Sequence, residues 1–208
     1  MKTSTRAVAL TAVVGLAFGL GGCSSDDDNA GADSQPDVNA APADTKWESL
    51  HGLKLPTAQD GPKVTDPVRF GYSHTPQGAV LSAINTQGQM AVVGDKDWPD
   101  LSRMALAPGK GRDQWAQQRA LVTVSGTIKP DQAPEFKGFK VSDYSDDKAI
   151  VTLAVDYPKA GLAAYPVQLA WLSDDWRVVL PSQEDNIEPT NIANLDGFTP
   201  YSSTEGEK

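Results

Sequence analysis

Residues 139–181 read FKVSDYSDDKAIVTLAVDYPKAGLAAYPVQLAWLSDDWRVVLP, and large apolar residues recur at every second position through much of this segment. A period of two is typical of half-buried β-strands. The apolar runs are separated by short turns rich in Ser, Asp, Pro and Gly. We expect strands at 139–144, 149–157, 164–172 and 176–180, and the short connections predict an antiparallel meander.

The period changes upstream of this meander. Thr75 suits the N-cap of a helix and Pro76 its first position, and small or branched apolar residues then follow at helical spacing (Ala79, Val80, Ala83 and Ile84). Two further helices are expected at 97–106 and 112–123. Helices followed by a meander, without βαβ alternation, predict an α+β fold in which N-terminal helices pack on a curved antiparallel sheet.

The flanking segments have less pattern. Residues 46–72 are interrupted by Pro and Gly, so we expect an irregular segment that wraps the domain, with a short edge strand at 68–72. The globular domain is expected to span 46–181. The tail, 182–208, is expected to dock in part and to be disordered after about residue 203.

The N-terminus has the pattern of an export signal. Lys2 and Arg6 precede an uncharged run, 7–20, that is too short to span a bilayer core of about 30 Å. Leu20-Gly21-Gly22-Cys23 then resembles the bacterial lipobox. We therefore predict a signal peptide at 1–22 and lipidation of Cys23, which would hold the protein on the extracytoplasmic face of the cell membrane. The alternative is an ordinary cleaved signal followed by a chance cysteine.

Composition limits the other functions. Residues 23–45 are acidic and almost free of large apolar side chains, so they are expected to form a disordered linker behind the lipidated cysteine. Removing the two basic residues of the signal changes the net charge from −9 to −11, which disfavours binding to nucleic acid. A single cysteine permits no intramolecular disulfide. No metal or cofactor is expected, because no spacing typical of ligands occurs.

Two segments carry a resemblance to a known family. Residues 70–79, FGYSHTPQGA, open the first helix, and residues 175–181, DWRVVLP, close the meander. Together they resemble an uncharacterised family of actinobacterial lipoproteins and membrane proteins, often found on conjugative or integrative elements. The resemblance implies a domain similar to the nuclear transport factor 2-like or cystatin-like folds, and a place in a DNA-transfer apparatus.

Candidate site residues are few. His74, Trp115, Trp171 and Trp176 are candidates for an interaction surface or for cavity walls, and no catalytic motif is present. Relatives of the broad fold that are isomerases use an Asp base with a Tyr donor, and Asp156, Tyr157 and Tyr165 are the nearest such residues here.

Three hypotheses of function follow from these residues. The first is a non-enzymatic scaffold that contacts an envelope protein complex. The second is a lipoprotein that binds a small ligand in a cavity under the curved sheet, and the third is an enzyme. The sequence determines neither the partner nor the oligomeric state.

Overall fold

The computed structural model describes residues 36–185 and 187–204. The expected signal peptide (1–22), the lipobox and Cys23 lie outside these residues. Within the described ranges the chain is a mixed α+β structure, with three helices and an antiparallel sheet of six strands. The predicted α+β class is confirmed at this level.

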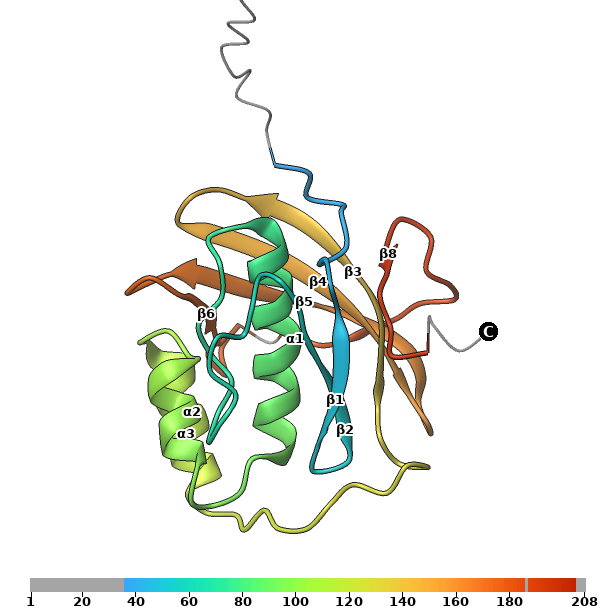
Figure 1. Ribbon diagram of the computed structural model, residues 1–208. Helices are drawn as coiled ribbons and strands as arrows, with labels where there is room; N and C mark the ends of the chain where they lie inside the picture. The colour runs from blue at the N-terminus through green and yellow to red at the C-terminus, as the bar shows by residue number, and fades with distance from the viewer. Residues whose placement is uncertain (1–35, 186, 205–208) are drawn as a thin grey trace, which may run out of the picture. The chain divides into compact units, whose positions relative to one another are not determined.

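The predicted meander forms the body of the sheet (Figure 1). Its strands are β3 (Glu135–Tyr144), β4 (Lys148–Tyr157), β5 (Gly161–Trp171) and β6 (Trp176–Val179). Two short tail strands join it: β7 (Thr190–Asn191) pairs with β5, and β8 (Thr199–Pro200) pairs with β3. The register of β3 against β4 shifts at two places, and such irregularities bend a sheet.

Helix α1 (Pro76–Val92) begins where the sequence predicts. The side chain of Thr75 accepts a hydrogen bond from the backbone N–H of Gly78 at 2.9 Å, and Pro76 is the first helical residue. Helices α2 (Trp98–Met104) and α3 (Lys110–Arg119) are shorter than expected. None of the helices in the described part of the chain is long and apolar enough to cross a bilayer.

A β-hairpin precedes the helices, in the segment for which the sequence predicts only irregular structure. It is formed by β1 (Lys46–Leu50) and β2 (Leu53–Thr57). The turn between them is possible because His51 and Gly52 have positive φ angles, 47° and 88°. Leu53 and Leu55 are buried, and this two-residue alternation is too short to stand out in a segment rich in Pro and Gly.

Residues 68–72 do not form the expected edge strand. The side-chain amide of Gln89, on α1, accepts from the backbone N–H of Arg69 and donates to its carbonyl oxygen. The guanidinium of Arg69 is buried and forms an ion pair with Glu48 at 3.1 Å. At Arg69 a helix side chain therefore takes the place of a neighbouring strand, while the next residue, Phe70, pairs with Val64 in an isolated bridge.

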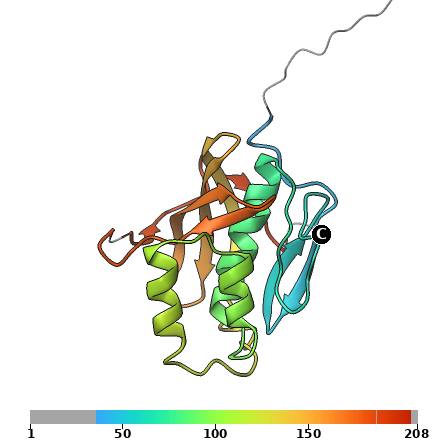
Figure 2. The ribbon, with the colours of Figure 1, turned by 90° about the vertical axis from the view of Figure 1, so that its left-hand side faces the viewer.

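The hydrophobic core lies between α1 and the sheet. Helix α1 lies between the hairpin and the α2–α3 pair, which Figure 2 shows from the side of α2 and α3. Small residues on α1, among them Ala79 and Ala83, are fully buried, so the helix approaches the sheet closely. The buried Ser82 donates to the carbonyl oxygen of Trp176 at 2.7 Å, which ties α1 to β6.

Residues 36–45 contact the domain, although the sequence assigns them to a disordered linker. Gln77 of α1 donates to the carbonyl oxygens of Asp37 and Ala40, at 2.8 and 3.0 Å. The hydroxyls of Thr45 and Tyr201 are 2.8 Å apart, so the tail and this segment meet. The expectation of a spacer that reaches residue 45 is therefore corrected: the domain begins by residue 36.

Candidate functional site

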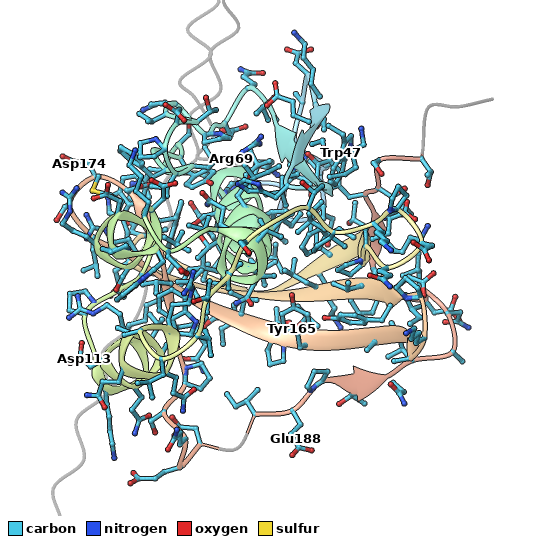
Figure 3. The ribbon with its side chains drawn as sticks, turned by 90° about the horizontal axis from the view of Figure 1, so that it is seen from below. Trp47, Arg69, Asp113, Tyr165, Asp174 and Glu188 are labelled. Carbon is cyan, nitrogen blue, oxygen red and sulfur yellow. The ribbon has the colours of Figure 1, made fainter. Side chains whose placement is uncertain are left out.

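A pocket of about 500 Å³ opens between the C-terminal half of α1 and the sheet. Helix residues Gln87, Gly88 and Ala91 form one wall, and Tyr165 of β5 lies opposite. Ile187, in the tail, closes part of a third side. Figure 3 shows Tyr165 on β5, between α1 and the tail segment that carries Glu188. Volumes of about 300–1,000 Å³ are usual for sites that hold drug-sized ligands.

Strand register places two tyrosines in this pocket. Side chains at alternate positions of a strand share one face, and Val151, Leu153 and Val155 of β4 face the core beneath α1. Tyr157 continues that series, and Tyr165 of β5 lies directly across from Leu153. Both tyrosines therefore point to the side of the sheet that α1 covers.

The same alternation separates Asp156 from the pocket. Asp156 lies between Val155 and Tyr157 on β4, so its side chain belongs to the other face of the sheet. Of the three residues considered for isomerase chemistry, Tyr157 and Tyr165 line the pocket and Asp156 does not. Among the described residues that line the pocket, none is a carboxylate that could act as a base beside the two phenols.

Gly88 allows the hairpin to pack against α1 beside the pocket. A Cβ at this position would collide with a methyl group of Leu55 and lie 3.0 Å from one of Leu53. Because glycine has no such atom, Leu53 reaches the pocket wall. The pocket is thus bounded by the sheet, α1, the hairpin and the tail.

The polar groups of the pocket are uncharged. Burial raises the pKa of the Tyr157 phenol, and burial together with the neighbouring Tyr157 raises the pKa of Tyr165. Both phenols are therefore protonated at neutral pH. Among the described residues that line the pocket, none carries a charged side chain. The arrangement can bind an apolar molecule and offer it hydrogen-bond donors.

Three of the four candidate aromatic residues meet at the other end of α1. His74 stacks on Trp171 with ring centroids 4.0 Å apart, and Trp171 contacts Trp176 edge-on at 5.4 Å. The ring centroids of Tyr144 and Trp176 are 5.8 Å apart. His74 also forms a hydrogen bond with the carbonyl oxygen of Asp146. This aromatic cluster packs where the helix begins and does not line the pocket described above; His74 and Tyr144 border a second hollow of about 580 Å³ there.

Trp115 belongs to neither site. It packs edge-on against Trp98 at 6.1 Å, and the buried Arg119 guanidinium lies 5.9 Å from the centre of the Trp98 ring. These contacts join α2 to α3. The role that the structure indicates for Trp115 is packing between two helices.

Most of the pocket residues carry no signal in the sequence that marks them as parts of one site. Gln87 and Leu53 come from α1 and the hairpin, which no local pattern connects with the strands. Tyr157 and Tyr165 could have been predicted, because they lie at the same alternate positions of their strands as the buried apolar residues. Leu20, Gly21, Gly22 and Cys23 lie outside the described residues, and within those residues no group of three or more His, Cys, Asp or Glu side chains could hold a metal ion.

Fold and site together define the class: an α+β domain with an apolar pocket between a helix and a curved antiparallel sheet. A family model described as "Domain of unknown function (DUF8175)" matches residues 21–200, so the chain belongs to this family. Comparisons with curated proteins and with solved structures found no match.

Proposed function

We propose that this protein is a lipid-anchored, non-enzymatic binding protein of the cell envelope that holds an apolar small molecule in the pocket between α1 and the sheet. The pocket itself carries the proposal: it has a volume of about 500 Å³, and its described lining is apolar apart from uncharged polar groups such as the two phenols. Catalysis would require acids, bases or nucleophiles that converge on one point. The pocket lining described above brings no such group to the phenols.

The anchor is supported by sequence. The lipobox-like residues 20–23 end at the only cysteine of the chain, and the family match includes that cysteine. Lipid attached there would hold the domain at the extracytoplasmic face of the cell membrane. A long helix packed on a curved antiparallel sheet also supports the likeness to nuclear transport factor 2-like and cystatin-like domains.

An uncharged fluorescent probe, N-phenyl-1-naphthylamine, tests the binding proposal. The full chain with Cys23→Ala is used, so that no attached lipid competes for the pocket. We expect the probe to brighten on binding, and Ala91→Trp, which places an indole in the pocket wall, to weaken binding about tenfold or more.

Ala120→Trp is the matched control, because Ala120 is exposed just beyond α3 and does not line the pocket. It should bind the probe as the unsubstituted chain does. Urea unfolding of both variants shows that each is folded. Equal probe affinity in the two variants, or no binding to any chain, would overturn the proposed function.

A second candidate function is a scaffold for an envelope protein complex, such as a DNA-transfer apparatus. The observation that favours it is an apolar pair just after α3: Leu121 is 86% exposed and Val122 is 55% exposed. Exposed apolar groups of this kind occur at protein interfaces. Crosslinking in the host cell tests it, and recovery of the monomer alone would count against it.

A further inference from the structure

We infer that the pocket selects an uncharged, largely apolar molecule that carries a hydrogen-bond acceptor such as a ketone or ester oxygen, and that it rejects carboxylates of the same length. This inference rests on the proposed function, because it names the class of ligand for the same pocket. It follows from the charge of the lining, from the protonation of the phenols and from the place of both tyrosines in the pocket wall.

The lining gives an anion nothing to pair with. Neither Lys nor Arg is among the described residues that border the pocket, and the chain as a whole is acidic, with a net charge of −9. Moving a carboxylate from water into such a site is costly unless a cation or several donors compensate it. A neutral molecule has no such cost.

The phenols supply the polar recognition. Tyr157 and Tyr165 both line the pocket, and burial raises the pKa of both phenols, so both are protonated at neutral pH. A protonated phenol can donate one hydrogen bond. The place of both tyrosines in the pocket wall puts their phenols within reach of a molecule held there. Both phenols can therefore donate a hydrogen bond to a ligand in the pocket.

The remaining wall matches an apolar body. Phe136, Val155 and Leu180 border the pocket together with the methylene-rich side chains of Met90 and Ile187. Such a lining favours burial of an alkyl chain or ring system. The expected ligand therefore has one polar end, which lies beside the tyrosines, and is apolar elsewhere.

Displacement of N-phenyl-1-naphthylamine by two matched compounds tests the inference. 2-Decanone is neutral and has a carbonyl acceptor, whereas decanoate has the same chain length and is anionic at pH 8. We expect 2-decanone to displace the probe at a concentration about tenfold or more below that of decanoate. Equal displacement by the two compounds would overturn the inferred ligand class and leave the proposed function intact.

Phenylalanine substitutions test the donors. Tyr165→Phe or Tyr157→Phe should weaken the binding of 2-decanone about three- to tenfold, which is the range expected for loss of one hydrogen bond. The affinity for the probe should change little. Tyr144→Phe, in the aromatic cluster, should have no effect. Unchanged 2-decanone affinity in both pocket variants overturns the role of the phenols. Failure of all chains to bind the probe is the separate result that removes the proposed function.

Discussion

Asp175 ties the start of α1 to the meander through a buried carboxylate. It is only 6% exposed, and its two oxygens accept from the backbone N–H groups of Gly71 and Tyr72, each at 2.8 Å. Burial opposes its ionisation and raises the pKa of the carboxyl, although the hydrogen bonds act in the opposite direction. One side chain thus couples the turn before β6 to the segment that enters the helix.

The raised pKa of Asp175 predicts a pH-dependent stability. A carboxyl with a folded-state pKa above its unfolded value of about 3.9 stabilises the fold below that value, and this contribution is lost as pH rises through the folded-state pKa. The free energy of unfolding of the unsubstituted chain, minus that of Asp175→Asn, should therefore be largest near pH 4 and fall toward neutrality. Urea unfolding at several pH values measures it.

The control for this experiment is the neighbouring residue. Asp174→Asn removes one negative charge, as Asp175→Asn does, but at an exposed position. The φ angle of residue 174 is 59°, which Asn tolerates. It should keep the pH profile of the unsubstituted chain. Asp175→Asn should also lose about 1–3 kcal/mol at every pH, because its amide NH₂ would face a backbone N–H. A stability difference that grows with pH contradicts the prediction.

At the scale of elements, α3 is held against the end of the meander by a close approach of backbones. A Cβ on Gly111, in the first turn of α3, would collide with the carbonyl oxygens of Leu180 and Pro181. Glycine is therefore required there by contact with another part of the chain. A Cβ on Gly109, two residues earlier, would have no neighbouring atom within 4 Å.

These two glycines make a matched pair. Gly111→Ala should lower the free energy of unfolding by about 1–3 kcal/mol, because α3 must move away from residues 180–181. Gly109→Ala should cost well under 1 kcal/mol, since its φ of 162° is ordinary extended backbone and only the weaker N-cap preference is lost. Urea denaturation gives both values, and equal losses would show that the contact at Gly111 does not hold α3.

At the scale of the whole molecule, the proposed function depends on where the domain is held. The domain begins by residue 36, which leaves a short acidic segment between it and Cys23. The aromatic cluster of His74, Trp171 and Trp176 packs where α1 begins, while the pocket opens toward the other end of α1. The aromatic cluster and the pocket therefore lie toward opposite ends of α1.

Lipidation predicts a specific mature N-terminus. Mass spectrometry of the membrane fraction should find a chain that starts at Cys23 and carries a diacylglyceryl group on its sulfur. Cys23→Ala should remove that lipid mass completely, whereas Ser24→Ala should retain it. An unmodified sulfur at the N-terminus, or an intact leader in the unsubstituted chain, would refute the anchor.

Local patterns predicted the elements with strong periodicity. The meander follows from alternation in residues 149–157, and the start of α1 follows from the Thr75–Pro76 cap. The hairpin was not predicted, because the alternation that includes Leu53 and Leu55 covers too few residues. The hydrogen bonds between the Gln89 side chain and the backbone of Arg69 were not predicted either. A side chain that pairs with a backbone in place of a strand leaves no periodic pattern in the sequence.

The sequence alone determined the α+β class, the antiparallel meander and the first helix, because periodicity and capping act between residues that are near in the chain. Tertiary structure decided the pocket. Tyr157 and Tyr165 meet Gln87 and Ile187 only because strand register, the approach of α1 and the return of the tail bring distant segments together. Tertiary packing also places His74, Trp171 and Trp176 toward the opposite end of α1, where their rings pack on one another and do not line this pocket.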